Sequence, residues 1–204
     1  MQSTLFGQNS YLVVAPKEAA AVVVDPGFGC AEEIGARLET RAASLDLILL
    51  THEHFDHLGN LNELKAAHGG KVVATRECSG RLGDPKANLS AFHGGLSYSA
   101  GPADLIVEDV GPVLDWRGHA IRFHPSPGHS PGSHCIEIEG RLFTGDTLIP
   151  GTKTVVKLPG GSKEKLAATM HYIFSTFPGA TLVHPGHGPV IPLSATCQEL
   201  HLPP

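Results

Sequence analysis

The feature that most constrains this chain is a cluster of four side chains of metal-binding types within six residues: His52, His54, Asp56 and His57. The cluster directly follows Leu45–Leu50, a short apolar run that is typical of a strand buried on both faces. On extended backbone, side chains two positions apart point to the same side, so His52 and His54 are placed to bind one metal ion together. A helix begins next, and this turn directs Asp56 and His57 toward a second ion. The pattern predicts a metal site at the carboxyl end of a strand in an α/β fold.

Three more candidate ligands stand alone, each in a Gly- or Pro-rich turn after an apolar run: His129, Asp146 and His187. Glycines beside a ligand let the backbone come close to a metal ion without steric clash. Each of these turns is a weak signal by itself. For the first cluster, surface histidines on a polar loop are the alternative interpretation. Together with the first cluster the three residues complete a set of seven, which favours a metal centre.

Regular elements alternate along the chain. Strands are predicted over Asn9–Val14, Ala21–Val24, Leu45–Leu50, Val72–Thr75, Ile121–His124, His134–Ile138, Arg141–Thr144 and Thr181–His184. Helices are predicted over Ala31–Thr40, over Leu58–His68, and from an N-cap at Ser162 to about Phe177. Residues 76–120 are rich in Gly, Ser and Asp-Pro, so loops with a short strand or two are expected there. The order of elements predicts one domain over residues 1–204, with two sheets packed face to face and helices outside.

Composition narrows the function classes. The 204 residues carry a formal net charge of −5, with no basic cluster of the kind that nucleic-acid binding needs. Apolar runs are far shorter than the roughly 20 residues of a membrane-spanning helix, and the N-terminal residues do not resemble a signal peptide. The four cysteines lie far apart, which favours reduced thiols. We therefore expect a cytoplasmic protein that acts on a small molecule rather than on nucleic acid or a membrane; the oligomeric state is left open.

Other polar residues near the cluster have two possible roles each. Three histidines lie close to the predicted ligand turns: His124, His134 and His184. Each either orients a ligand or ends a strand with its own partners. Asp25 either supports a ligand or caps its turn, and Glu53 alternates away from its histidine neighbours, which favours an outward or supporting position.

The series His-x-His-x-Asp-His, a lone His, a lone Asp and a final His resembles the metallo-β-lactamase-fold hydrolases, most of all the glyoxalase II-type branch. The resemblance runs from about Asn9 to Pro189 and includes Val24–Gly27 and Leu158–Gly161. It implies an αββα sandwich of two packed mixed sheets flanked by helices. It also implies a ligand set: His52, His54 and His129 for the first ion, Asp56, His57 and His187 for the second, and Asp146 as the bridge.

This resemblance implies a hydrolase in which a hydroxide held by two divalent ions attacks a thioester or a related activated acyl group. Asp56 is a candidate for handling the released proton. Histidine and carboxylate ligands suit zinc, with iron and manganese as alternatives. Lactone or phosphodiester hydrolysis is one alternative function, and persulfide oxidation at a single iron is another. An anionic substrate is possible because of the lysines near residues 153–165, although a solvated lysine face explains them as well.

Overall fold

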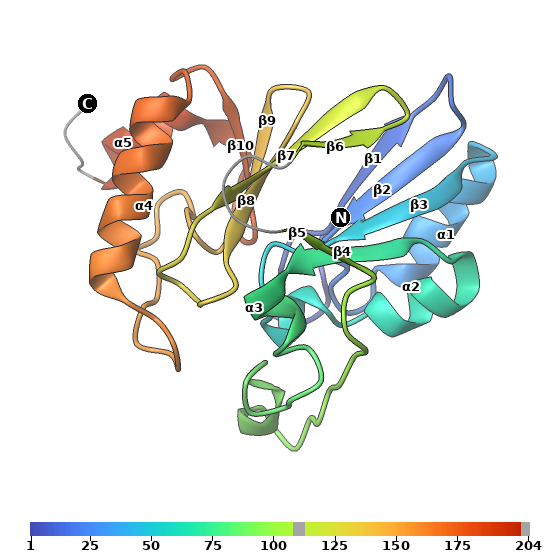
Figure 1. The fold of residues 1–204 in the computed structure, drawn as a ribbon, viewed down its shortest axis with the longest axis horizontal. Coiled ribbons are helices and arrows are strands. Elements are labelled where there is room, and N and C mark those ends of the chain that lie inside the picture. The colour runs from blue at the N-terminus through green and yellow to red at the C-terminus, as the bar shows by residue number, and fades with distance from the viewer. Residues whose placement is uncertain (108–112, 201–204) are drawn as a thin grey trace. The chain divides into compact units, whose positions relative to one another are not determined.

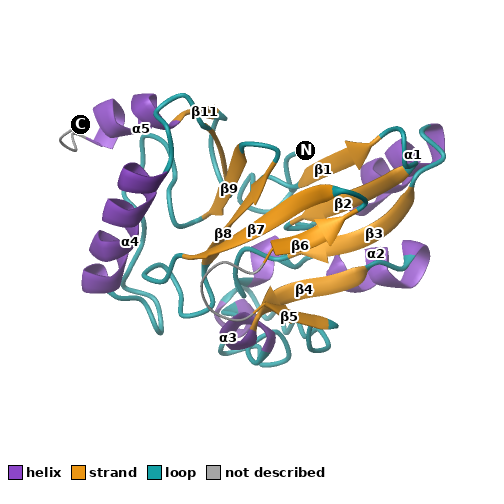
Figure 2. Cartoon of the chain, turned by 45° about the horizontal axis from the view of Figure 1, so that its top comes forward, coloured by secondary structure: helices purple, strands orange, loops and turns teal. Residues whose placement is uncertain are grey.

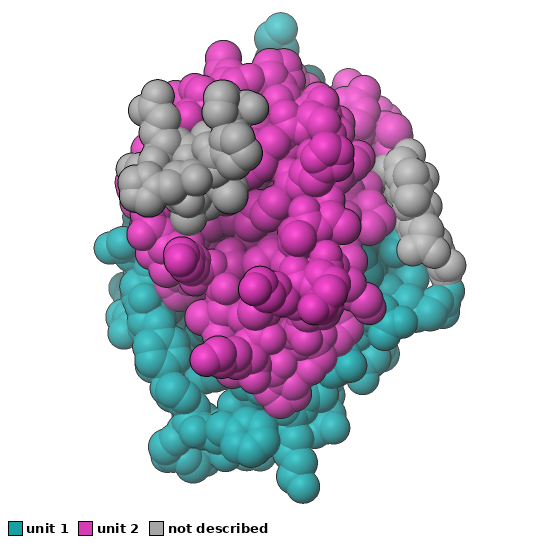
Figure 3. Space-filling view, turned by 90° about the vertical axis from the view of Figure 1, so that its left-hand side faces the viewer, with its two compact units in different colours: residues 1–107 teal, residues 108–204 magenta. Residues whose placement is uncertain are grey.

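A computed structural model describes residues 1–107 and 113–200 of the chain, with side chains described to residue 196. The chain divides into two compact units, Met1–Val107 and Glu108–Pro204 (Figure 3). Each unit has its own sheet, and each is described by itself below. The expectation of one domain over residues 1–204 stays a prediction.

The first unit is built on a five-stranded mixed sheet. Its strands are β1 (Tyr11–Ala15), β2 (Ala20–Val24), β3 (Ser44–Leu49), β4 (Lys71–Thr75) and β5 (Leu105–Val107), which lie side by side in that order. β1 is antiparallel to β2, and the pairs β2–β3, β3–β4 and β4–β5 are parallel. All five residues of β2 are buried, as expected for the interior of a sheet covered on both faces.

Helices α1 (Ala31–Thr40) and α2 (Leu61–His68) lie along this sheet, with the short helix α3 (Arg76–Ser79) after β4 (Figure 1). Ile34 of α1 and Leu64 of α2 belong to one buried apolar cluster with sheet residues such as Ile48. Burial of a side chain of this size contributes about 1.5–3 kcal/mol. Two 3₁₀ turns complete the unit, η1 (Phe55–His57) and η2 (Ser90–Phe92). This packing fixes the carboxyl end of β3, where the predicted ligand cluster begins.

The second unit has a six-stranded mixed sheet (Figure 2). Its strands are β6 (Val113–Trp116), β7 (His119–Pro125), β8 (His134–Ile138), β9 (Arg141–Gly145), β10 (Leu182–Pro185) and β11 (Ile191–Pro192), in the spatial order β11-β10-β9-β8-β7-β6. Only β9–β10 is a parallel pair. Because β8 runs antiparallel to both β7 and β9, the strands β7, β9 and β10 all end at the same edge of the sheet.

Helices α4 (Lys163–Thr176) and α5 (Leu193–Leu200) accompany this second sheet. Ile173 of α4 and Leu193 of α5 share a buried cluster with Leu142 and Val183 of the strands. Ser162 caps α4 as predicted, because its hydroxyl accepts a 3.2 Å hydrogen bond from the backbone N–H of Lys165. A tight hairpin joins β8 and β9, since Glu139 and Gly140 both have positive φ.

Two mixed sheets with flanking helices confirm the predicted fold class. Residues 76–120 contain the short strands β5 and β6, as predicted, and also α3, η2 and the start of β7, which were not predicted there. Helix α5 was not predicted at all. Among the described residues, every helix falls short of the length and apolar character needed to cross a bilayer.

Candidate metal centre

The first unit supplies four of the predicted site residues from one segment after β3. His52, His54 and His57 are buried, with exposed fractions of 5% or less, whereas the Asp56 side chain is 13% exposed. The imidazole of His52 lies 4.7 Å from that of His54 and 4.2 Å from that of His57, measured between ring centroids. Three buried imidazoles this close together repel one another when protonated, so the arrangement suits neutral rings that bind a cation.

A buried carboxylate, Asp25, holds this segment in place. Its Oδ1 accepts a hydrogen bond from the backbone N–H of Thr51 at 2.7 Å, and its Oδ2 accepts one from the Thr51 hydroxyl at 2.6 Å. Oδ2 also lies 2.9 Å from Nδ1 of His57. Asp25 follows the last residue of β2 and has a positive φ of 51°, in the left-handed region that Asp tolerates better than most residues. Of its two predicted roles, Asp25 therefore has the supporting one.

Hydrogen bonds at Nδ1 set the tautomers of three imidazoles. Nδ1–H of His57 donates to Asp25, and Nδ1–H of His129 donates to the carbonyl oxygen of Val155 at 2.9 Å. The Thr51 hydroxyl gives its proton to Asp25, so it accepts from Nδ1–H of His52 at 3.1 Å. In all three rings the lone pair then lies on Nε2. This outer support of Nδ1 is characteristic of histidines that bind metal through Nε2.

The second unit supplies three residues from three turns, which follow β7, β9 and β10 at one edge of the sheet. Nε2 of His129 lies 3.7 Å from Oδ2 of Asp146, and Nε2 of His187 lies 3.6 Å from Oδ1 of the same carboxylate. The backbone N–H of Gly186 donates to the carbonyl of Gly145 at 2.8 Å, which ties two of the turns together. One carboxylate oxygen thus faces each histidine, the geometry that a bridging ligand needs.

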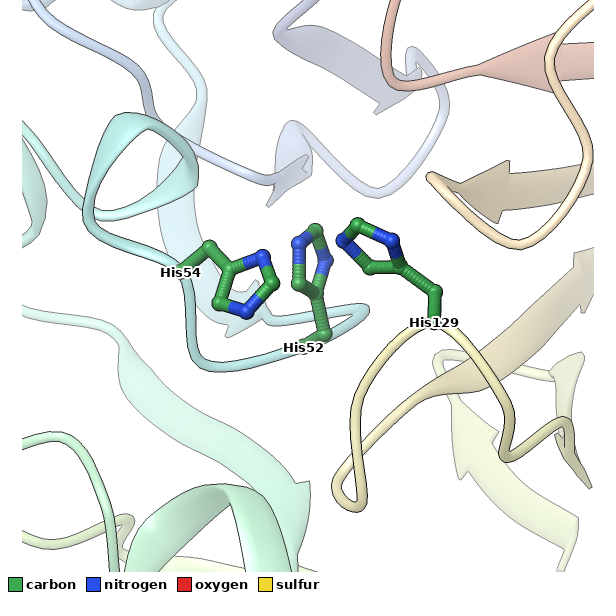
Figure 4. Close-up of side chains that lie close together, drawn as sticks. All are labelled: His52, His54 and His129. Atoms are coloured by element: carbon green, nitrogen blue, oxygen red, sulfur yellow. The ribbon is translucent and has the colours of Figure 1, made fainter. Parts of the chain in front are cut away.

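Two groups of three side chains have ligand atoms within 4.8 Å of one another. The first group is His52, His54 and His129, and the second is Asp56, His57 and His187. Figure 4 shows the three rings of the first group side by side, with His52 and His54 on one loop and His129 on another. Nitrogen and carboxylate donors in sets of three, with Nδ1 of His52, His57 and His129 held by hydrogen bonds, fit divalent ions of the zinc and iron kind. These clusters are consistent with a dinuclear metal site.

A third close group contains Asp25, His52 and His57. Here the Asp25 carboxylate already accepts from Thr51 and His57, as described above. Its role in this group is therefore to orient the imidazoles rather than to bind an ion.

Three further polar residues near the cluster differ in their surroundings. Glu53 is 1% exposed and lies 3.7 Å from the guanidinium of Arg81, so its predicted outward position is wrong, and its supporting position stays a prediction. His124 Nδ1 lies 2.9 Å from the Tyr172 hydroxyl and its Nε2 lies 3.2 Å from Glu137, which makes it a strand-end residue with partners of its own. Burial, with a smaller effect of Arg141, lowers the pKa of His184 to about 4.

Cysteine does not supply a nucleophile among the described residues. Cys30, Cys78 and Cys135 are buried free thiols. Burial raises the pKa of Cys135 to about 12 and that of Cys78 well above its ordinary value. Both groups are uncharged thiols at neutral pH, and a thiol is a poor nucleophile. Among the described residues, the side chains that could hold a metal ion together are histidines and aspartates.

Comparison with known proteins agrees with this geometry. Residues 3–187 match the family model of the metallo-β-lactamase superfamily. The chain belongs to that superfamily, and its two mixed sheets with flanking helices are the metallo-β-lactamase fold. It is a metal-dependent hydrolase of this class.

Among curated proteins, the chain is 32% identical over 183 residues to the probable metallo-hydrolase YqgX of Bacillus subtilis, covering 89% of this chain and 85% of the relative. It is 30% identical over 187 residues to the hydroxyacylglutathione hydrolase GloC of Haemophilus influenzae, covering 91% and 87%.

Two solved structures share the fold at 29% identity. The B3 metallo-β-lactamase BLEG-1 superposes with a TM-score of 0.90 over 97% of this chain and 95% of the other. TTHA1623 in a di-iron-bound form superposes with a TM-score of 0.81 over 98% and 96%.

Proposed function

We propose that this chain hydrolyses a thioester or a related activated acyl compound at a dinuclear metal centre. In this proposal His52, His54 and His129 bind one ion, and Asp56, His57 and His187 bind the other. Asp146 binds both. The observation that carries the proposal is the pair of three-residue groups, each with ligand atoms within 4.8 Å, together with an Asp146 carboxylate whose two oxygens face one histidine of each group.

Two divalent ions at these residues supply a hydroxide nucleophile at neutral pH and polarise the acyl oxygen. The chain's own residues make that chemistry possible. Asp25 and Val155 keep the imidazoles in the tautomer with Nε2 as acceptor. Asp56 has its Oδ2 3.7 Å from Nε2 of His57 and remains 13% exposed, so its carboxylate is placed to pass a proton to solvent.

The metal in this proposal is zinc, since nitrogen and carboxylate ligands without thiolate suit that ion. Iron is the second candidate because TTHA1623 is known in a di-iron form. The two candidates differ in reaction type, since iron also supports oxygen chemistry.

The thioester is favoured by the 30% identity to a hydroxyacylglutathione hydrolase over most of both chains. A β-lactam is the second candidate substrate, because the fold also matches a B3 metallo-β-lactamase over nearly its whole length. Both substrates are acyl compounds with a carbonyl carbon open to attack, so the same donor set serves either reaction.

The test first measures metal identity and stoichiometry by mass spectrometry. It then measures the turnover rate of a panel of candidate substrates. The panel contains a hydroxyacyl glutathione thioester, a simple acyl thioester, a lactone, a phosphodiester, a β-lactam and a persulfide with oxygen uptake recorded. About two zinc ions per chain with thioester turnover supports the proposal. One iron with oxygen uptake, or turnover of the phosphodiester alone, overturns it.

A further inference from the structure

The segment that carries four of the candidate ligands has two faces. His54 lies on extended backbone, with φ −68° and ψ 139°, so the residues on either side of it, Glu53 and Phe55, point away from the side of its imidazole. Both neighbours are buried, with 1% of Glu53 and 5% of Phe55 exposed. Groups that contact these two neighbours therefore fix the position of His54 without touching its ring.

Such contacts come from one loop of the first unit, residues 81–100, which follows α3 (Figure 1). Nε of Arg81 lies 3.7 Å from Oε1 of Glu53. The backbone N–H of Phe55 donates a hydrogen bond to the carbonyl oxygen of Asn88 at 3.0 Å. The loop thus contacts the ligand segment at both positions that flank one candidate ligand.

The Asn88 side chain holds this loop together from the inside. Its amide nitrogen donates to the carbonyl oxygens of Leu82 at 3.2 Å and Tyr98 at 2.9 Å, and its amide oxygen accepts from the backbone N–H of Ser90 at 3.0 Å. The residue is completely buried, and the N–H of Ala100 closes the loop by donating to the Leu82 carbonyl. One side chain therefore determines where the Asn88 carbonyl lies, and that carbonyl holds the ligand segment.

Arg81 acts on the segment through its charge. The carboxylate of Glu53 is removed from water, and a buried charge needs an opposite charge or hydrogen-bond donors close by. The Arg81 side chain is itself 30% exposed, so its guanidinium keeps contact with solvent while Nε faces the carboxylate. Substitution of Arg81 therefore removes a charge from the support of the segment and leaves the apolar core intact.

We propose that Arg81 and Asn88 are positioning residues, which hold His54 in its metal-binding position through Glu53 and Phe55. This inference rests on the ligand assignment of the proposed function. A metal site needs its ligands within about 0.5 Å of their productive positions. Weaker support at either contact therefore lowers the affinity for the ion that His54 binds and changes the geometry around that ion.

A double-mutant cycle tests Arg81, with Co²⁺ as the probe because its visible absorption reports the geometry around the ion. Affinity is measured by competition with a chelator, and spectra are recorded at saturating Co²⁺, for wild type, Arg81→Gln, Glu53→Gln and the double variant. Arg81→Gln is expected to lower the affinity for one of two ions about tenfold and to change the spectrum. Because the two side chains act as a pair, the double variant loses no more than either single variant. A loss of stability alone leaves the spectrum of the fully loaded protein unchanged.

Two further variants make the result specific. Arg81→Lys keeps the positive charge and retains most of the wild-type affinity. Lys86→Gln is the matched control, because it removes one positive charge from an exposed position of the same loop, and it keeps the wild-type affinity and spectrum. Additive losses in the cycle, or an equal change in Lys86→Gln, overturn the role of Arg81.

Asn88→Asp tests the second contact. The carboxylate keeps the size of the amide, but it cannot donate to the two carbonyl oxygens that the amide holds. The affinity for Co²⁺ is expected to fall about 10–100-fold, with a changed spectrum at saturation. Ser99→Ala is the matched control, since it removes another hydrogen bond of the loop, from the Ser99 hydroxyl to the Gly83 carbonyl at 3.1 Å, and keeps the wild-type affinity. Wild-type affinity in Asn88→Asp, or an equal loss in Ser99→Ala, overturns the role of Asn88. If Asn88→Asp does not fold, the Arg81 cycle decides the proposal by itself.

Thioester turnover, measured with the same metal-loaded proteins, separates this inference from the proposed function. Wild-type protein that binds two ions and hydrolyses no thioester rejects the proposed function alone. Turnover in the wild type, with unchanged affinity and spectrum in Arg81→Gln and Asn88→Asp, rejects the role of the loop alone. Wild-type protein that binds no Co²⁺ rejects both.

Discussion

The two units hold their candidate ligands by different means. In the first unit, the four candidate ligands come from one short segment, and hydrogen bonds to a single buried carboxylate, Asp25, hold Thr51 and His57 of that segment. In the second unit, His129, Asp146 and His187 come from three separate turns, and sheet topology brings those turns to one edge. Backbone atoms do the fixing there, as in the hydrogen bond from His129 to the Val155 carbonyl.

This difference determines which substitutions displace the candidate ligands of each unit. A network that passes through one side chain is sensitive to that side chain, because its removal leaves several buried donors without an acceptor. A set held by backbone atoms tolerates most side-chain changes but is sensitive to any change that moves the backbone. The predictions below test the two halves in order of expected effect.

Removal of the Asp146 carboxylate has the largest expected effect. In Asp146→Ala the candidate ligand that faces both His129 and His187 is lost, so we expect metal to be released or bound in altered stoichiometry. Activity falls by about three orders of magnitude or more, because the metal supplies several kcal/mol of transition-state stabilisation. Mass spectrometry of bound metal and kcat/KM check this result. Asp115→Ala, an exposed position on β6, is the control. Wild-type metal content and rate in Asp146→Ala contradict the assignment.

Asp25→Asn tests the network of the first unit. The amide keeps the size of the carboxylate, but its NH₂ group cannot accept from both Nδ1 of His57 and the Thr51 hydroxyl. Metal affinity is expected to fall about 10–100-fold, the usual cost of losing an outer partner of a metal-binding histidine. Competition with a chelator measures the affinity.

Two partner variants sharpen this test. Thr51→Val breaks only the relay to His52 and has a smaller effect, and Thr51→Ser restores the hydroxyl. Val155→Ala in the second unit leaves affinity unchanged, because the carbonyl that holds His129 belongs to the backbone. An equal loss of affinity in Val155→Ala and Asp25→Asn removes the distinction between the two units.

The difference between one dense segment and three separate turns also determines how much of the candidate site the sequence predicts. The first cluster is dense, and its spacing alone indicates a metal site. The network behind it is not visible in the sequence, because Asp25 reaches Thr51 and His57 across separations of 26 and 32 residues. The three residues of the second unit are far apart in the sequence. They are recognised as one group only from the strands that end at the same edge of the sheet, or from a family resemblance. Their metal-binding roles stay predictions.

Helices with a clear local signal were predicted from the sequence, and helices without one were missed. Helix α1 was predicted with its observed bounds because Ile34 and Leu38 lie one turn apart on its buried face. Helix α4 was predicted from the Ser162 cap. Helix α5 was missed because its stretch is short and weakly patterned, so its stability comes from tertiary packing such as that of Leu193. Helix α3 is only four residues long, and its Thr75 cap stands in a segment rich in loop residues.

Gly128→Ala tests the backbone of the second unit. This glycine precedes His129 with a φ of 143°, and an added Cβ lies about 2.5 Å from Cα of Leu166 on α4. Overpacking against backbone, with the penalty for positive φ, is expected to lower the free energy of unfolding by about 2–4 kcal/mol. Urea denaturation of the metal-free protein measures it.

Gly140→Ala is the matched control for that substitution. Gly140 has a φ of 70° in the β8–β9 turn, and an added Cβ meets no heavy atom within 4 Å. Its cost is the backbone penalty alone, about 1–2 kcal/mol. A cost in Gly128→Ala no greater than in Gly140→Ala shows that the approach of α4 does not constrain the His129 turn.

The smallest expected effect concerns His184 of β10, which ends beside the turn of His187. The folded-state pKa of about 4 lies below the ordinary value of 6.5, so between these values the unfolded chain binds more protons than the folded chain. The free energy of unfolding therefore falls as the pH is lowered from about 6.5 toward 4, and the contribution of a neutral His184 is fully present above that window.

In His184→Phe, whose ring is able to pack on Phe143 as the imidazole does, this fall becomes shallower. Urea titrations of metal-free protein at several pH values measure the slope, since acid also releases metal from histidine ligands. His171→Phe, at an exposed position on α4, keeps the wild-type slope. An unchanged slope in His184→Phe shows that the imidazole is not buried in its neutral form, and that acid acts on the second unit through other groups.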